Sequence, residues 1–206
     1  YNKKILTSEF LRNFCQKDLA SLGLECPDCI ISSGKHSALP HHHGSGPLKE
    51  SVPIILDIFP RDIESGYFAD ITRTIVKGKP GKILKNMYEV VKKGQITGVK
   101  LVKAERNGKT IHNKIRKIFD DEGFSTDFSK KNPDGFIHST GHGLGLQIHE
   151  PPRISDIDEI LKKNQVITVE PGLYYPKIGG IRIEDTVLVT KSGCKNLSKF
   201  PKFFEI

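Results

Sequence analysis

Residues 54–58 read Ile54-Ile55-Leu56-Asp57-Ile58, so that one carboxylate stands inside a run of large aliphatic side chains. A short apolar run of this kind, rich in isoleucine, predicts a buried β-strand. A carboxylate on a buried strand is costly unless a positively charged group neutralises it. Asp57 is therefore the first residue that points beyond the fold to a function.

Three further carboxylates repeat this pattern. They open or close the runs Asp70-Ile71-Thr72-Arg73-Thr74, Val166-Ile167-Thr168-Val169-Glu170 and Gly180-Ile181-Arg182-Ile183-Glu184. Lysine is absent from all four runs, so the only basic residues within them are Arg73 and Arg182. Two arginines can pair with one or two carboxylates but cannot compensate four. The pattern indicates that metal ions supply the missing positive charge.

Histidines add a second type of metal ligand. Three of the eight, His138, His142 and His149, fall between residues 136 and 151. Glycines at 141, 143 and 145 allow the backbone to approach whatever the imidazoles bind. One histidine in such a run is more often structural. Three of them, together with four strand-borne carboxylates, predict a metal site.

In chain order these runs resemble the motifs of the pita-bread metallopeptidases, the family of aminopeptidase P, prolidase and methionine aminopeptidase. The matching motifs are Asp57, Asp70-Ile71-Thr72-Arg73-Thr74, Gly141-His142-Gly143-Leu144-Gly145, Thr168-Val169-Glu170-Pro171-Gly172-Leu173-Tyr174 and Arg182-Ile183-Glu184-Asp185. They fall within a core of about residues 34–190. The resemblance implies an α+β pita-bread fold, with two related halves around a dinuclear metal site. We expect one catalytic domain over residues 1–206, and no domain before residue 1 is visible.

The resemblance also implies a role for each ligand. Asp57 corresponds to a chelating ligand of one ion, His142 and Glu170 to ligands of the other, and Asp70 and Glu184 to bridges between them. Four carboxylates and one imidazole form a mainly hard ligand set, which favours Mn²⁺ and also accepts Co²⁺, Zn²⁺ or Fe²⁺. Two such ions hold a water as hydroxide and polarise the scissile carbonyl. Glu170 is expected to handle the proton of that water.

Other residues match family positions around the metals. His149 resembles a catalytic histidine that contacts the substrate carbonyl, and His41 resembles one near the leaving nitrogen. His138 resembles a substrate-binding histidine of the proline-specific branch. Arg182 is expected to orient the bridging carboxylates, and Tyr174 to pack near the site.

The expected activity is hydrolysis of the peptide bond before proline, by an Xaa-Pro aminopeptidase or an Xaa-Pro dipeptidase. His138 and the run 70–74 favour this branch over methionine aminopeptidase, which is the alternative enzyme. The alternative that is not an enzyme is a non-catalytic binding module on the same fold. The one feature in its favour is the segment 77–117, with thirteen Lys or Arg against Glu89 and Glu105. Because the lysines alternate with an apolar helical stripe, we interpret them as a solvated helix face and expect no nucleic-acid partner.

Composition gives the remaining expectations. The chain has 36% hydrophobic residues and no apolar run long enough to cross a bilayer, so no membrane partner is expected. Four cysteines without an apolar leader indicate reduced thiols and a cytoplasmic location. Cys26 and Cys29 form a C-x-x-C motif, which lacks a second ligand pair for zinc and is interpreted as two free thiols. The resemblance implies a homodimer that acts on peptides.

Hydrophobic periodicity and turn residues predict the elements of a single α+β domain. Helices are expected from Thr7 or Ser8 to Gly23, from Ile83 to Val102 and from Ile111 to Gly123. Gly94 and Gly98 are expected to weaken the second helix. Strands are expected at 29–32, 52–59, 66–76, 147–149, 166–169 and 180–190, with loops at 34–46 and 150–164.

Overall fold

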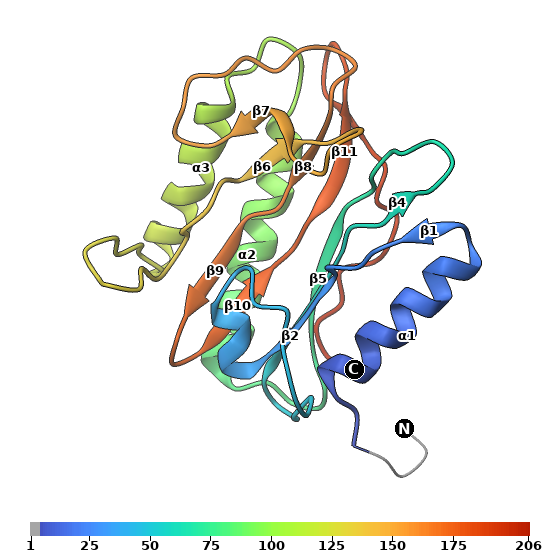
Figure 1. Ribbon diagram of the computed structural model, residues 1–206. Helices are drawn as coiled ribbons and strands as arrows, with labels where there is room; N and C mark the ends of the chain where they lie inside the picture. Colours follow the sequence, from blue (N-terminus) through green and yellow to red (C-terminus); the bar gives the residue numbers. More distant parts are fainter. Residues whose placement is uncertain (1–4) are drawn as a thin grey trace.

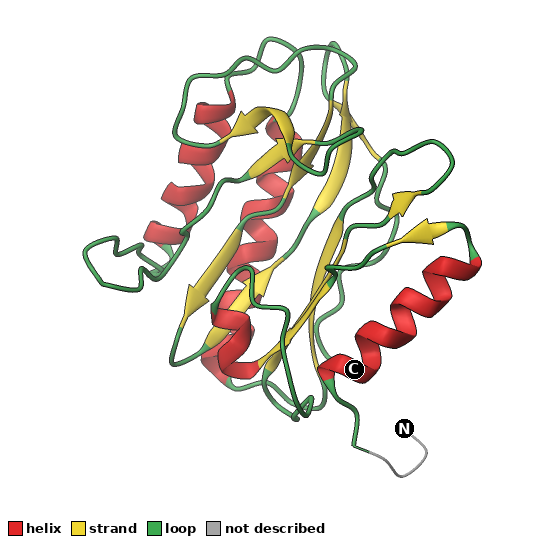
Figure 2. Ribbon diagram, viewed as in Figure 1, coloured by secondary structure: helices red, strands yellow, loops and turns green. Residues whose placement is uncertain are grey.

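The computed structural model describes residues 5–206, which form an α+β fold (Figures 1 and 2). Its helices are α1 (Ser8–Ser21), α2 (Lys82–Leu101) and α3 (Gly108–Asp121), with a short 3-10 helix at Gly34–Ala38. Its strands are β1 (Leu24–Glu25), β2 (Ile30–Ser33), β3 (Pro53–Ile58), β4 (Arg61–Asp62), β5 (Ile71–Val76), β6 (Gly141–Gly143), β7 (Glu150–Ile154), β8 (Val166–Val169), β9 (Gly172–Tyr175), β10 (Gly179–Arg182), β11 (Asp185–Val189) and β12 (Cys194–Asn196).

The strands are divided between a smaller and a larger sheet. The smaller one is antiparallel with the order β2-β3-β5, and the larger one has the order β12-β11-β8-β6-β7. Short pairs β1–β4 and β9–β10 complete the set. Helix α1 contacts the first half at β1 and β2, whereas α2 and α3 pack on each other and on the second half (Figure 1). This is the two-part α+β arrangement that the sequence predicts.

The main core lies between α2, α3 and the larger sheet, and Gly94 and Gly98 have a specific place in it. A Cβ atom at Gly94 would lie 2.7 Å from Phe119, and one at Gly98 would lie 2.9 Å from both Ile115 and Val169. Both distances are shorter than a carbon–carbon contact. The two glycines therefore let α3 and β8 approach α2 closely. This packing offsets their low helix propensity.

Several predicted elements are confirmed. Helix α1 begins where expected, with the Thr7 hydroxyl accepting a hydrogen bond from the Phe10 amide at 3.2 Å. Helix α3 has Asn107 as its N-terminal cap. Strands β2, β3 and β8 fall within a residue or so of their predicted limits. The 66–76 strand is shorter than predicted, because pairing with β3 begins at Ile71.

The strand predicted at 147–149 is wrong. Those residues form bends, while the strands on either side of them are β6 and β7. Strand β7 also occupies the start of the predicted loop 150–164. Strand β6 was not predicted, because glycine weakens a strand. Gly141 and Gly143 form one here because neighbouring backbone lies very close to them. A Cβ at Gly143 would lie 2.4 Å from the Pro151 carbonyl oxygen. The predicted strand 180–190 is divided into β10 and β11.

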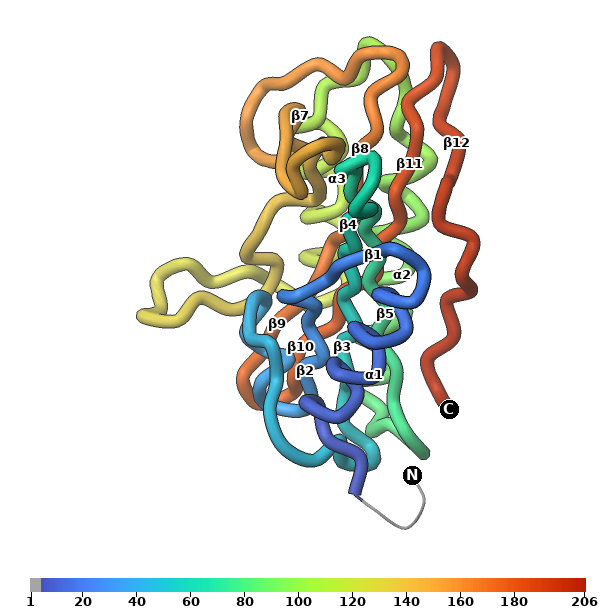
Figure 3. The backbone as a smooth tube through the Cα atoms, turned by 45° about the vertical axis from the view of Figure 1, so that its right-hand side comes forward, coloured from blue at the N-terminus to red at the C-terminus, as the bar shows by residue number. Residues whose placement is uncertain are grey.

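The C-terminal segment returns to the first half of the molecule (Figure 3). The Val76 amide donates to the Phe204 carbonyl at 2.7 Å, and Glu205 forms a parallel bridge with Val76. Arg73 donates to the carbonyl oxygens of Phe200 and Pro201 at 2.6 and 3.2 Å. The end of the chain is thereby fixed to β5, the strand that follows Asp70.

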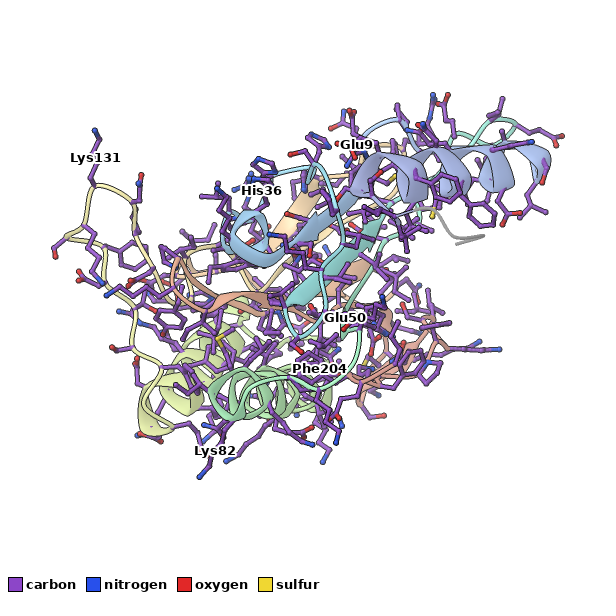
Figure 4. All side chains as sticks on the ribbon, turned by 90° about the horizontal axis from the view of Figure 1, so that it is seen from below. Glu9, His36, Glu50, Lys82, Lys131 and Phe204 are labelled. Atoms are coloured by element: carbon purple, nitrogen blue, oxygen red, sulfur yellow. The ribbon has the colours of Figure 1, made fainter. Side chains whose placement is uncertain are left out.

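The basic segment 77–117 faces solvent along α2 and α3. Lys82 points away from the body of the molecule in Figure 4. Lys85 and Lys93 lie 2.7 Å from Glu205 and Glu122, and Lys117 lies 2.8 Å from Asp121. These three exposed ion pairs are consistent with a solvated helix face. Within residues 5–206 no helix has the length and apolar character needed to cross a membrane.

Candidate metal centre

The five predicted metal ligands come from different strands but line one cavity of about 520 Å³. Asp57 is on β3, His142 on β6, Asp70 precedes β5, Glu170 follows β8, and Glu184 lies between β10 and β11. Pairing of β3 with β5 places Asp57 opposite Thr72, and the Thr72 carbonyl accepts the Glu184 amide at 3.1 Å. The two halves of the fold therefore meet at the ligands.

The ligand atoms are close enough to share cations. Those of Asp70, His142 and Glu184 lie within 4.8 Å of one another, and all three residues are buried. His142 Nε2 lies 3.8 Å from an Asp70 oxygen and 3.4 Å from Glu170 Oε1. Burial is the main cause of the low pKa of His142, about 4, which keeps its imidazole neutral and able to bind a metal.

Two buried carboxylate oxygens at the site are available to bind a cation. Asp70 Oδ1 and Glu184 Oε1 have no hydrogen-bond partner among the described residues. Burial, then the neighbouring carboxylates, raises the pKa of both groups well above the ordinary value. Burial likewise raises the pKa of Glu170. Divalent cations would satisfy these oxygens and offset the repulsion, so the residues present fit the predicted dinuclear site.

Arg182 contacts Asp57, a ligand that the prediction did not pair with it, in addition to reaching Glu184. Its Nη2 atom lies 2.5 Å from Asp57 Oδ2 and its Nη1 atom donates to the Tyr174 hydroxyl at 2.7 Å. Its Nε atom donates to the Thr72 hydroxyl at 3.3 Å, which in turn donates to Glu184 Oε2 at 2.7 Å. Arg182 thus orients Asp57 directly and Glu184 through Thr72.

Arg73 does not neutralise any of the five ligands. Its Nη2 atom lies 2.8 Å from Asp185 Oδ1, and it also donates to the Glu184 backbone carbonyl. Asp185 Oδ2 accepts from Gln95 at 3.1 Å and from Asn196 at 2.8 Å. Although Asp185 follows a ligand in the sequence, both its oxygens are already occupied by structural partners. Arginine pairing therefore compensates only one of the four buried carboxylates, within the part of the chain described.

His138 lines the cavity, but both of its ring nitrogens are engaged. Nδ1 lies 2.7 Å from the Ser139 carbonyl, which can only accept, so Nδ1 carries the proton. Nε2 then accepts from the Tyr174 hydroxyl at 2.8 Å. Burial is the main cause of the low pKa of His138, about 3, so the ring stays neutral. Its neighbours leave no free N–H for a substrate, because the one N–H is held by the Ser139 carbonyl and Nε2 can only accept.

His149 and His41 lie on the accessible side of the cavity. Both are exposed, and the His149 ring stands edge-on to His142 with 4.4 Å between ring centres. Burial, Arg153 and His41 lower the pKa of His149. A side chain that touches a ligand from the solvent side is well placed to contact a substrate.

The remaining loop histidines do not line this cavity. His42 Nδ1 accepts from the Gly44 amide at 2.9 Å, and its ring stacks on His36 with 4.2 Å between centres. His43 is exposed, and its carbonyl accepts from Arg12. These contacts fix the shape of the loop that carries His41.

Two residues with a place at the site were missed by sequence reasoning. Arg153 on β7 lines the cavity and forms no ion pair within the described part of the chain. It was missed because residues 150–164 were interpreted as a loop. Thr72, fully buried, links Arg182 to Glu184. Its position two residues after Asp70, on the same face of a strand, was the available signal.

A second cavity of about 600 Å³ lies on the other side of Asp70. Its lining is mostly apolar and includes Phe68, Leu144 and Val166. Asp70 is the only one of the five ligands that reaches it. The smaller cavity, which holds all five, is therefore the candidate active site.

Comparison with known proteins agrees with this geometry. The model of metallopeptidase family M24 matches residues 4–191. The Xaa-Pro dipeptidase of Pyrococcus furiosus is 44% identical over 181 residues, which are 86% of this chain and 49% of that protein. A putative Xaa-Pro aminopeptidase of Mycoplasma genitalium is 36% identical over 98% of this chain and 56% of its own length.

Solved structures give the same result. The prolidase from Pyrococcus furiosus superposes with a TM-score of 0.88 at 39% identity, over 97% of this chain and 57% of that one. The X-Pro aminopeptidase from Thermotoga maritima superposes with a TM-score of 0.87 at 32% identity, over 98% and 56%. The chain thus spans about half the length of the relatives it matches.

Proposed function

Because the chain belongs to metallopeptidase family M24 and has its pita-bread fold, we propose that it is the catalytic region of a metal-dependent peptidase. The proposed reaction is hydrolysis of the peptide bond before proline. One observation carries the proposal: all five ligand residues line one cavity, and two of their buried oxygens lack a partner among the described residues.

We propose that the site holds two divalent ions, with the ligands divided as the family resemblance implies. Asp57 would belong to one ion, His142 and Glu170 to the other, and Asp70 and Glu184 to both. Mn²⁺ suits this mainly carboxylate set best, although Co²⁺, Zn²⁺ and Fe²⁺ also fit. When bound, such ions supply Lewis acidity and lower the pKa of a water molecule.

The protein's own side chains would then move protons and orient the substrate. Glu170 Oε1, beside His142, would accept the proton of the attacking water. His149 would donate a hydrogen bond to the carbonyl oxygen as negative charge develops there. His41, exposed on the same cavity, would lie near the departing nitrogen. Arg182 would hold Asp57 in place throughout.

The relatives support the proline-specific reaction over a methionine aminopeptidase. Those compared above are called Xaa-Pro dipeptidase, prolidase or X-Pro aminopeptidase. A non-catalytic binding module is disfavoured because the ligand set is complete and lines one cavity. Arg153 favours short substrates among the Xaa-Pro peptides. Arg153 lines the cavity and has no ion pair among the described residues, so its guanidinium is available to bind the C-terminal carboxylate of a dipeptide.

The test compares matched peptides on the Mn²⁺-loaded protein. We expect kcat/KM to be highest for an Xaa-Pro dipeptide, lower for the same peptide extended by one residue, and negligible for Met-Ala. Arg153→Met should remove the preference for the dipeptide over the longer peptide, whereas Lys162→Met, at an exposed position outside the cavity, should not. Equal rates on Met-Ala and Xaa-Pro would contradict the proline-specific proposal.

We also propose a homodimer and a cytoplasmic location. The dimer follows from the family resemblance, and the location from four cysteines that all remain free thiols. Light scattering during gel filtration would measure the mass in solution, and a mass equal to one chain would contradict the dimer.

A further inference from the structure

The motif Cys26-Pro27-Asp28-Cys29 has no part in the proposed peptidase reaction. It joins β1 to β2, and Pro27 and Asp28 form a turn. A β-turn brings its first and fourth Cα atoms within about 7 Å. A disulfide spans Cα separations of about 4.4–6.8 Å. The turn therefore holds the two cysteines at a separation that suits a disulfide.

Both cysteines are buried, with exposed fractions of 3% and 0%, and the turn places their side chains near one another. The interaction between the two thiols is the main cause of the lowered pKa of Cys29, and the charge of Arg12 acts in the same direction. It is also the main cause of the raised pKa of Cys26. Of such a pair, Cys29 is the thiol better suited to react as a thiolate.

A metal does not explain the pair. Structural zinc requires four ligands. Among the described residues, the one group of three or more potential ligands within reach of each other is Asp70, His142 and Glu184. Cys15 of α1 interacts with Cys29 electrostatically but does not form such a group with the pair. Two adjacent thiols without further ligands are suited to oxidation instead.

The turn lies between α1 and the wall of the metal-site cavity. The backbone of Phe59 lies near enough to Cys26 to lower the pKa of its thiol, and Ile30, next to Cys29, pairs with Asp57. Both Phe59 and Ile30 line the cavity. From the other side, Gln16 of α1 donates to the carbonyl oxygens of Cys26 and Pro27 at 3.3 and 2.9 Å. The position of both cysteines is therefore fixed before any reaction.

We propose that Cys26 and Cys29 are a redox-active dithiol that hydrogen peroxide converts reversibly into a disulfide. The Cys29 thiolate attacks one peroxide oxygen, the O–O bond breaks, and the departing hydroxide takes up a proton to form water. Cys29 is then a sulfenic acid. The Cys26 sulfur attacks it, the S–S bond forms, the S–O bond breaks, and hydroxide leaves with the Cys26 proton as a second water. The two sulfurs together lose two electrons, which reduce the peroxide. A small dithiol reductant reverses the change.

The test uses the full chain treated with stoichiometric hydrogen peroxide. Intact mass should fall by two hydrogens, titratable thiols should fall from four to two, and peptide mapping should find Cys26 joined to Cys29. Dithiothreitol should restore all four thiols. Cys194→Ser, at a position on β12 far along the chain, should still form the bond. Cys26→Ser should stop at a sulfenic acid on Cys29 that dimedone traps, whereas Cys29→Ser should give neither product.

Other results would overturn the proposal. The proposal is wrong if all four thiols are retained after peroxide treatment. It is also wrong if the disulfide includes Cys15 or Cys194, or if all four cysteines are labelled equally. Circular dichroism shows whether the serine variants fold. If they do not, the wild-type peptide map and its reversal by dithiothreitol decide the question. None of these measurements depends on peptidase activity, so failure here and failure of the proposed function are distinguishable.

Discussion

Arg182 Nη2 lies 2.5 Å from Asp57 Oδ2, so a predicted metal ligand is held by the single arginine that also reaches Glu184 through Thr72. Asp57 is therefore held in this orientation by a protein side chain and needs no cation for it. Partners that orient ligands in this way contribute strongly to metal affinity.

Replacing Arg182 should weaken metal binding. Arg182→Lys keeps the charge but cannot contact Asp57, Thr72 and Tyr174 at once, so we expect affinity for Mn²⁺ to fall about 10–100-fold. Isothermal titration calorimetry of the metal-free protein measures the change. Tyr174→Phe removes only one of these contacts and should cost less. Unchanged affinity in Arg182→Lys would show that Asp57 needs no such support.

Loss of Asp70 or Glu184, which we propose to bind both ions, should reduce metal content more than loss of Asp57, which we propose to bind one. Asp70→Ala or Glu184→Ala should reduce bound Mn²⁺ from about two ions to none, whereas Asp57→Ala should retain about one. Elemental analysis after gel filtration gives the ratio. Asp185→Asn is the matched control, because this neighbour of Glu184 is occupied by Arg73 and Gln95. It should lower thermal stability and keep both ions.

The metal-free protein should become less stable as pH rises. Asp70, Glu170 and Glu184 have pKa values raised above those of the unfolded chain, mainly by burial. Their contribution to stability is therefore complete below the ordinary carboxylate pKa and is lost as pH rises through the raised values. Between about pH 5 and about pH 8 we expect Tm to fall.

Metal should reverse this trend, because protons compete less for the ligands as pH rises. The difference in Tm between Mn²⁺-saturated and metal-free protein should thus widen from acid to neutral pH. Differential scanning calorimetry with and without EDTA measures both curves. Glu184→Gln should flatten the curve of the metal-free protein. A metal-free Tm that rises over this range would contradict the assignment.

Most of the candidate site could be predicted from the sequence, because carboxylates within apolar strands are anomalous wherever the strands lie in space. The five ligands stand in short runs that are visible without a fold. Their partners are not, since Arg182 reaches Asp57 across 125 positions of the chain. Strand β6 was missed for a related reason: Gly141 and Gly143 have no β-propensity, and only the neighbouring backbone makes them a strand.

His149 should matter for turnover and not for metal binding. Its ring touches His142 but is not among the ligands, and it faces the accessible side of the cavity. His149→Ala should lower kcat by about 10²–10³, as expected for loss of a hydrogen-bond donor to a developing oxyanion. The control is His42→Ala, whose ring lies outside the cavity lining and should leave kcat unchanged. A rise in KM at constant kcat would make His149 a binding contact only.

His138 provides the test of proline specificity. Proline has no amide hydrogen and a fixed φ, so a site that selects it needs a shaped wall more than a backbone acceptor. The neutral His138 ring, fixed by Tyr174 and the Ser139 carbonyl, is such a wall on the cavity. His138→Ala should therefore lower kcat/KM for an Xaa-Pro peptide more than for the matched Xaa-Ala peptide, with Mn²⁺ content unchanged. Tyr174→Phe keeps the ring in place but removes one of its two hydrogen bonds, and should retain most of the preference. If both variants lose Mn²⁺ and activity on all peptides equally, His138 acts through Tyr174 and Arg182 on the metal ligands and does not select proline.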